Sequence, residues 1–169
     1  MPEAVRDGPR DPRDKLLARR QVARVMGRIR REGLCLVFTN GVFDLLHPGH
    51  VRLLRRARLL GDRLVVGVNT DASVRRLKGP RRPLLRLNDR ALMLASLEAV
   101  DYVVTFTEDS PLRIIELVKP DILVKGSDWK AGTIVGSEFV ERNGGRVIRV
   151  PIAKGFSTTR LARDIQRRG

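Results

Sequence analysis

The two histidines of the chain lie in one tetrapeptide, His47-Pro48-Gly49-His50, and their type and spacing suggest chemistry. Pro48 and Gly49 set a tight turn between the imidazoles, so both rings are expected at one site. Imidazoles can donate hydrogen bonds or positive charge to a phosphoryl group whose oxygens gain negative charge in a transition state. The tetrapeptide therefore predicts phosphoryl chemistry by positioning and electrostatic stabilisation, with His47 and His50 as catalytic residues.

A histidine pair can also hold a metal ion or serve the structure alone. Zinc needs more protein ligands than two histidines. The rest of the chain offers one cysteine, Cys35, inside an apolar run, and scattered carboxylates. We therefore expect no metal ligands among the side chains, while a purely structural role of the histidines stays open.

The residues before the turn favour an anion-binding site. Residues 34–38 form a short apolar run that is typical of a buried parallel strand, and residues 39–44 lead from it into the turn. Gly41 permits close approach of the backbone to a ligand. The free N–H groups and the dipole of a helix starting near residue 49 attract phosphate oxygens. We expect phosphates to bind at this strand end.

The elements that must position these residues alternate along the chain. Further apolar runs at 64–68, 102–106, 122–124 and 147–150 predict strands, and helical patterns occur at 49–60, 88–98, 110–119, 134–142 and 158–167. This alternation predicts an α/β, Rossmann-like open parallel sheet with helices on both faces. Ligands bind such sheets outside the carboxyl ends of the strands, where the strand order reverses.

The length of 169 residues fits a single domain. Residues 1–13 are rich in Pro, Arg and Asp and predict a disordered or loosely attached tail. Apolar residues at helical spacing between Asp14 and Arg31 predict an N-terminal helix at the start of a domain spanning 14–169. The chain has no secretory signal and no long apolar run, so we expect a cytoplasmic protein without a membrane partner.

The net charge of +15 is the outlying feature of the composition. A basic surface can bind nucleic acid, or it can concentrate small anionic substrates such as nucleoside triphosphates and sugar phosphates. The excess is mostly arginine spread from Arg6 to Arg168, without aromatic interleaving or a zinc-finger pattern. This distribution disfavours nucleic acid as the partner.

Residues 40–50 resemble the GxFDxxHxGH signature of the cytidylyltransferase-like nucleotidyltransferases. Further matches follow in order at residues 67–71, 76–80, 88–90, 124–128 and 156–159. The resemblance covers residues 34–165, and within the superfamily it is closest to the D-glycero-β-D-manno-heptose 1-phosphate adenylyltransferases. Two departures bear on this match. One is the length, since no sugar-kinase domain precedes the transferase as it does in the bifunctional heptose enzymes, and the other lies at residues 127–129. Ser127 stands where those enzymes tend to have glycine, and Asp128-Trp129 is similar to the glycerol-3-phosphate cytidylyltransferases.

The resemblance implies roles for individual residues. It implies that Lys78 contacts the reacting phosphate from a mobile loop, and the alternative is that Lys78 is an ordinary solvated lysine in that loop. It gives Asp44 a sugar hydroxyl or the ordering of the turn, and it gives Arg90 the sugar phosphate unless Arg90 is simply an exposed helical arginine. The nucleotide-binding residues that it implies are Thr39, Asn40, Gly41, Val42, Phe43, Gly126, Asp128, Ser157, Thr158 and Thr159.

The reaction implied by the resemblance is transfer of AMP from ATP to a sugar 1-phosphate, with Mg²⁺ as the cofactor, yielding ADP-heptose for lipopolysaccharide. Because no sugar-kinase domain precedes the transferase in this sequence, we expect the sugar kinase and the phosphatase of the pathway to be separate proteins. The resemblance also allows a homodimer. Cytidylyl transfer to glycerol 3-phosphate or another polyol phosphate remains an alternative. A nucleotide-binding regulator or a basic nucleic-acid-binding module is the non-enzyme alternative.

Overall fold

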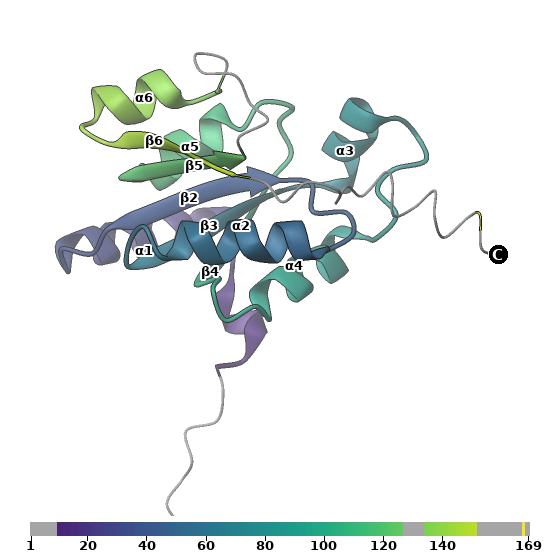
Figure 1. Cartoon of the computed structure of the whole chain (residues 1–169), viewed down its shortest axis with the longest axis horizontal. Coiled ribbons are helices and arrows are strands. Elements are labelled where there is room, and N and C mark those ends of the chain that lie inside the picture. The colour runs from purple at the N-terminus through teal and green to yellow at the C-terminus, as the bar shows by residue number, and fades with distance from the viewer. Residues whose placement is uncertain (1–9, 127–133, 152–166, 168–169) are drawn as a thin grey trace, which may run out of the picture.

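Six parallel strands form one sheet in the order β1-β4-β3-β2-β5-β6 (Figure 1). The computed structural model describes residues 10–126 and 134–151, together with Arg167. The strands are β1 (Leu16–Leu17), β2 (Leu36–Gly41), β3 (Arg63–Asn69), β4 (Tyr102–Phe106), β5 (Ile122–Gly126) and β6 (Arg146–Val150).

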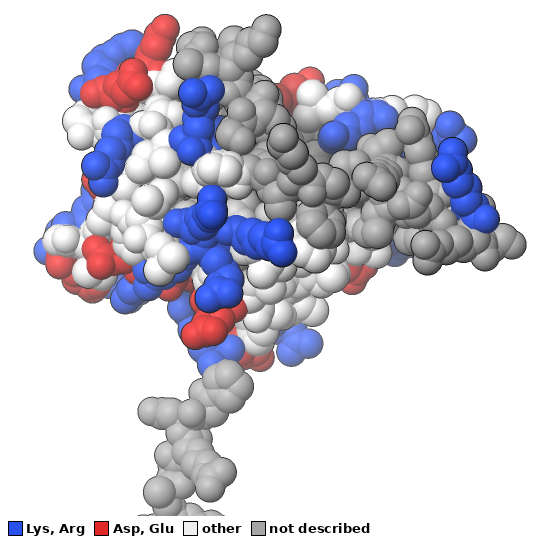
Figure 2. Space-filling model, in the orientation of Figure 1, with Lys and Arg blue, Asp and Glu red and all other residues white. Residues whose placement is uncertain are grey.

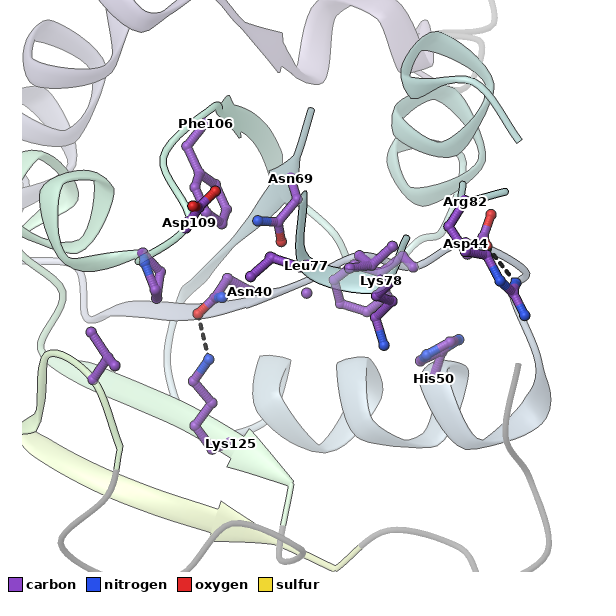
Figure 3. Close-up of a pocket in the computed structure, with 15 residues that line it drawn as sticks. Asn40, Asp44, His50, Asn69, Leu77, Lys78, Arg82, Phe106, Asp109 and Lys125 are labelled. Atoms are coloured by element: carbon purple, nitrogen blue, oxygen red, sulfur yellow. Dashed lines mark hydrogen bonds and ion pairs between the residues drawn. The ribbon is translucent and has the colours of Figure 1, made fainter. Parts of the chain in front are cut away.

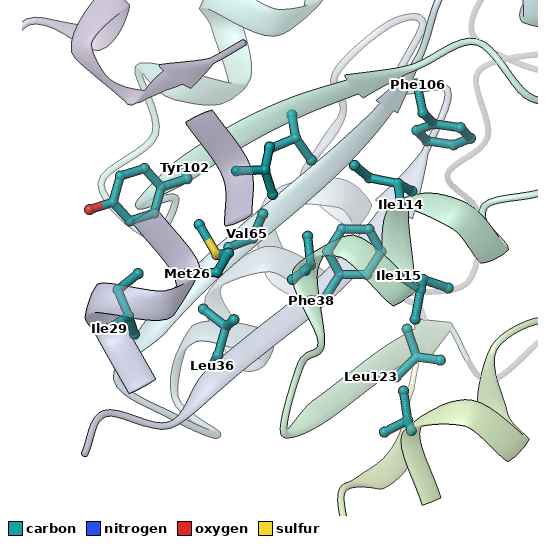
Figure 4. Close-up of a cluster of buried hydrophobic side chains, with 14 of the residues drawn as sticks. Met26, Ile29, Leu36, Phe38, Val65, Tyr102, Phe106, Ile114, Ile115 and Leu123 are labelled. Atoms are coloured by element: carbon teal, nitrogen blue, oxygen red, sulfur yellow. The ribbon is translucent and has the colours of Figure 1, made fainter. Parts of the chain in front are cut away.

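Helices cover both faces of the sheet because successive strand residues are apolar on both sides. Phe38 packs with α1 (Arg19–Arg31), α5 (Leu112–Val118) and α6 (Ser137–Arg142) on one face (Figure 4). Its neighbour Val37 packs with α2 (Pro48–Arg58) and α4 (Leu87–Ala95) on the other. The predicted Rossmann-like α/β fold is therefore confirmed, and four predicted helices correspond to α2, α4, α5 and α6 with slightly different ends.

The sheet opens between β2 and β5. Strand β2 pairs with β3 along its whole length, from Leu36 to Gly41, but it pairs with β5 only through Val37 and Phe38. Beyond Phe38 the carboxyl ends of β2 and β5 have no ladder between them. The strand order also reverses here, since the chain runs from β2 outward to β3 and β4 and then returns to β5. An opening of this kind is where open α/β sheets bind ligands.

The N-terminal helix begins later than its sequence pattern predicts. Residues Pro12–Lys15 form a 3-10 turn, η1, Leu16 and Leu17 pair with β4, and α1 starts only at Arg19. The reason is the direction of the two leucines, because Leu16 packs on one core and Leu17 on the opposite one. Opposite directions for successive residues are the period of a strand. The side chain of Gln21 then accepts a hydrogen bond from Ala18 N at 2.8 Å, which supports the helix start.

Helix α3 (Asp71–Lys78) occupies a segment for which no helix was predicted. The Thr70 side chain accepts a hydrogen bond from Ser73 N at the start, and Gly79, with a φ of 95°, ends the helix. These are ordinary start and stop signals, but the helix is short and buries little apolar surface. As a result Lys78, expected in a mobile loop, is the last residue of a helix.

Basic side chains gather on the molecular face over α2 (Figure 2). Arg52, Arg55 and Arg56 of this helix are exposed. In the part of the chain that the structure describes, no helix is long and apolar enough to cross a membrane. Residues 1–9 of the predicted tail at 1–13 lie outside the described residues, and so does the predicted helix at 158–167 except for Arg167, whereas Pro12 and Arg13 belong to η1.

Candidate active site

A cavity of about 740 Å³ lies at the carboxyl ends of β2, β3, β4 and β5 (Figure 3). The end of β2 and the loop after it supply residues 40–44, and His50 comes from the first turn of α2. The remaining lining residues are Asn69, Leu77, Lys78, Arg82, Phe106, Asp109, Pro111, Lys125 and Val135. The cavity therefore coincides with the opening of the sheet.

The loop after β2 brings backbone close to the cavity. A Cβ at Gly41 would lie 3.1 Å from the Phe43 ring, so a larger residue would force that ring to move. Phe43 itself has a φ of 48°, a conformation that side-chain-bearing residues rarely adopt and that recurs at functional sites. Of the five predicted residues in this segment, Asn40, Gly41, Val42 and Phe43 line the cavity, whereas Thr39 is buried and does not.

The two histidines have different positions. His47 is the residue before α2, and its Nδ1 accepts a hydrogen bond from His50 N at 3.4 Å. The two rings stack with centroids 3.7 Å apart, and Phe43 meets the His50 ring edge-on at 5.1 Å. Only His50 lines the cavity. His47 thus caps the helix and supports the ring of His50.

Burial, together with a smaller contribution from repulsion by His47, lowers the pKa of His50 to about 4. A hydrogen bond with the backbone of Leu45 acts in the opposite direction. The pKa of His47 is also lowered by burial. In the free protein at neutral pH both imidazoles are therefore neutral, which favours hydrogen bonding over positive charge. The Nδ1 atom of His50 is buried and has no hydrogen-bond partner among the described residues.

Asp44 is buried and orders the loop that follows α3. Its carboxylate accepts hydrogen bonds from Leu84 N at 2.7 Å and Leu85 N at 3.1 Å, and it pairs with Arg82 Nη1 at 2.7 Å. The sequence suggested that Asp44 orders its own turn, but the backbone N–H groups that it holds belong to a loop about 40 residues later in the chain.

Arg90 requires a correction. It was expected to reach a sugar phosphate, but it is 1% exposed and does not line the cavity. Each guanidinium nitrogen donates to the protein, and the acceptors are Leu85 O, Val42 O, Asn69 O and Asp71 Oδ1. The cause is its place on the inward face of α4, beside carbonyls at the strand ends that need donors. Arg90 thus positions the loops around the cavity.

Lys125 and Arg82 line the cavity although the sequence-based prediction did not select them. Lys125 is 6% exposed, and its amino group donates to Asn40 Oδ1 across the opening between β2 and β5. The sequence indicates this position, because Lys125 directly follows the apolar run 122–124 that predicts a strand. Arg82 gave no comparable signal because its segment contains three other arginines at positions 81, 86 and 90.

The remaining predicted nucleotide-binding residues come after Lys125. Gly126 is the last residue of β5 and does not line the cavity, while Asp128, Ser157, Thr158 and Thr159 lie outside the described residues. The described residues contain no group of three or more His, Cys, Asp or Glu that could hold a metal ion.

Comparison with protein families matches residues 38–160 to a model described as cytidylyltransferase-like. A curated relative named bifunctional protein HldE, from Syntrophotalea carbinolica, is 52% identical over 151 residues, covering 89% of this chain and 31% of the relative. A protein of the same name from Rhodospirillum rubrum is 54% identical over 145 residues, covering 86% of this chain and 29% of the relative. The chain spans about a third of the length of these relatives.

Solved structures share the fold. The lipopolysaccharide core biosynthesis protein from Thermoplasma volcanium is 34% identical, with a TM-score of 0.60 over 73% of this chain and 100% of that one. Pantoate-beta-alanine ligase from Francisella tularensis, solved with a β,γ ATP ligand and β-alanine, has a TM-score of 0.62 at 15% identity over 89% of this chain and 76% of that one. The second similarity concerns the fold alone.

Proposed function

The chain belongs to the cytidylyltransferase-like family of nucleotidyltransferases, and from this premise we propose that it transfers AMP from ATP to a sugar 1-phosphate. The proposed acceptor is D-glycero-β-D-manno-heptose 1-phosphate, and the products are ADP-heptose and pyrophosphate. The relatives named HldE are about half identical to this chain. The name of the similar Thermoplasma protein, which refers to lipopolysaccharide core biosynthesis, supports an acceptor from that chemistry.

One geometric observation carries the proposal. The opening of the sheet brings the backbone at Gly41, the imidazole of His50 and the amino group of Lys78 to a single cavity. Close backbone approach, a neutral donor and a positive charge are the features that bind a triphosphate and stabilise the charge that develops during transfer.

The reaction is an in-line displacement at the α-phosphorus of ATP. An oxygen of the acceptor phosphate forms the new P–O bond, and the bond from the α-phosphorus to the bridging oxygen of the β-phosphate breaks. The bridging oxygen keeps the electron pair and leaves as pyrophosphate. In this proposal His50 donates a hydrogen bond and Lys78 provides positive charge to the oxygens of the transferred phosphoryl group, while His47 holds His50 in place.

Mg²⁺ is part of the proposal as a companion of the triphosphate. Among the residues that the structure describes, two carboxylates line the cavity, Asp44 and Asp109, and both are engaged in ion pairs with arginines. A cage of protein ligands therefore does not fit these residues. Mg²⁺ commonly keeps several waters and binds through substrate phosphates, so we propose that it arrives bound to ATP, and no step is assigned to it. By family resemblance we also keep Gly126, Asp128, Ser157, Thr158 and Thr159 as proposed nucleotide contacts.

The test is a pyrophosphate-release screen of ATP, CTP, GTP and UTP against heptose 1-phosphates and glycerol 3-phosphate. We expect the highest kcat/KM for ATP with D-glycero-β-D-manno-heptose 1-phosphate. A higher kcat/KM for CTP with every acceptor would show that Asp128-Trp129, which resembles the glycerol-3-phosphate cytidylyltransferases, was the better guide.

A further inference from the structure

The cavity contains an arginine whose surroundings prepare it to bind an anion. Arg82 lines the cavity, and its side chain is 19% exposed. One of its nitrogens, Nη1, is held by the buried carboxylate of Asp44 at 2.7 Å. The described residues provide no hydrogen-bond acceptor for its Nε and Nη2 groups, while its backbone N–H donates to Gly79 O. A guanidinium that is fixed on one side and open on the other is well suited to a phosphate.

The loop that carries Arg82 is fixed by the same carboxylate. Asp44 also accepts hydrogen bonds from Leu84 N and Leu85 N, so one buried group sets both the backbone of the loop and the direction of the guanidinium. Arg90 adds a second anchor by donating to Leu85 O at 3.1 Å. Such preorganisation lowers the entropy lost when a ligand binds.

The position of Arg82 in the cavity indicates which substrate it serves. In Figure 3 Lys125 and Asn40 lie toward one end, Asp44 and Arg82 lie toward the other, and Lys78 and His50 lie between them. The end with Lys125 is the opening between β2 and β5, where a nucleotide is expected in an open α/β sheet. The end with Arg82 therefore remains for the second substrate.

We infer that Arg82, oriented by Asp44, binds the phosphate group of the acceptor. The inference rests on the proposed function for the identity of the acceptor, but it makes a separate claim about one residue and one class of ligand. It replaces Arg90, which the sequence suggested for this task, with an arginine that lies eight positions earlier in the chain.

The test is calorimetric titration of protein loaded with α,β-methylene ATP, an unreactive analogue that fills the donor site. Wild type, Arg82→Gln and Arg82→Lys are each titrated with heptose 1-phosphate, glycerol 3-phosphate and inorganic phosphate. The matched control is Arg81→Gln, which removes the same charge from the neighbouring residue, an exposed arginine that does not line the cavity. Melting curves accompany every variant.

We expect Arg82→Gln to weaken binding of the phosphate compounds by about tenfold or more, because a charge-assisted hydrogen bond is lost. Arg82→Lys should fall between wild type and Arg82→Gln, since lysine keeps the charge but loses the planar fork, and it should keep the fold if Arg82→Gln does not. Arg81→Gln should match wild type, and the affinity for the ATP analogue should be unchanged in all variants.

Three results would overturn the inference. Weaker binding of the ATP analogue with unchanged binding of the phosphates would assign Arg82 to the donor. Equal losses in Arg82→Gln and Arg81→Gln would show a general effect of charge, and failure of loaded wild type to bind any of the three phosphates would exclude the site. Failure of the proposed reaction is read separately, as absence of pyrophosphate release by wild type with every sugar phosphate.

Discussion

At the scale of residues, the imidazoles that are proposed to contact the triphosphate are neutral. The stacked rings of His47 and His50 and the Phe43 ring form a partly buried aromatic group in which a positive charge is disfavoured. A neutral imidazole still donates one hydrogen bond. Catalysis by His50 should therefore depend on the position of a donor, and the two histidines should respond differently to substitution.

We predict that His50→Ala lowers kcat by roughly 10²–10³, the loss typical of removing one oxyanion donor. His50→Asn should recover part of the activity because asparagine donates a hydrogen bond without charge. Both should melt near the wild-type temperature. Pyrophosphate release and melting curves provide the measurement, and near-full activity of His50→Ala would contradict the role.

His47 provides the contrast to this prediction. Loss of a helix cap costs about 1 kcal/mol, so His47→Ala should lower both kcat and the melting temperature, and His47→Asn should restore the melting temperature because asparagine caps helices well. Equal melting temperatures for the alanine and asparagine variants would exclude the capping role of His47.

The lowered pKa of His50 predicts a pH dependence of stability. An unfolded histidine titrates near pH 6.5, and folded His50 titrates at about 4. Between these values the unfolded state binds more protons, so the contribution of His50 to stability is complete above about pH 6.5 and is lost as the pH falls toward 4. Urea unfolding over this range should show a smaller fall for His50→Asn than for wild type. Parallel curves would mean that His50 titrates normally in the folded protein.

At the scale of elements, α3 decides where Lys78 lies. The helix begins at the Thr70 cap and ends at Gly79, so the lysine is delivered to the cavity from a helix end. A residue in a helix has fewer conformations to lose when it contacts a substrate than one in a mobile loop. The end of the helix, in turn, depends on the conformation of a single glycine.

Lys78→Ala should lower kcat by roughly 10² or more while changing the ATP dissociation constant far less, because its charge matters most when charge develops on the phosphoryl group. Single-turnover kinetics and equilibrium binding of ATP separate the two quantities. An unchanged kcat would return Lys78 to the status of a solvated lysine.

Two glycine substitutions should change stability in opposite directions. Gly27 lies inside α1, and an added Cβ would make ordinary contact with Arg31 at 3.5 Å, so Gly27→Ala should stabilise by about 0.5–1 kcal/mol. Gly79 has a φ of 95° with open space around the added atom, so Gly79→Ala should destabilise by about 1–2 kcal/mol through the backbone alone. Urea unfolding measures both, and stabilisation by Gly79→Ala would contradict the assigned helix end.

At the scale of the whole molecule, the opening of the sheet creates the cavity. Strands β1, β4, β3 and β2 form one side and β5 and β6 the other, and the two sides share a ladder only at Val37 and Phe38. The hydrogen bond from Lys125 to Asn40 spans the gap farther along the strands. This pair therefore connects the two parts of the sheet where a nucleotide is proposed to bind.

Lys125→Met should weaken ATP binding by about tenfold, because methionine fills similar space but leaves Asn40 Oδ1 without that donor and removes a charge from the nucleotide end. Lys119→Met is the matched control, since Lys119 is exposed and does not line the cavity. Calorimetric titration with ATP compares them. Equal effects of the two substitutions would mean that Lys125 acts only through net charge.

The sequence alone determined the fold class, the edge of the sheet that carries the site and the family. Apolar strands separated by amphipathic helices allow few arrangements, and residues 40–50 are contiguous, so their spacing survives folding unchanged. This is why the loop after β2 and the placement of His50 at the start of the following helix were predictable.

Only the tertiary structure decided which of several similar side chains face the cavity. Arg82 and Arg90 have the same chemistry, and their difference arises from long-range partners: Asp44 holds one, and carbonyls at Val42 and Asn69 take the donors of the other. The same holds for Leu16 and Leu17, which extend because β4 offers an unpaired edge. Contacts between residues tens of positions apart leave no local pattern, so the sequence could not distinguish these roles.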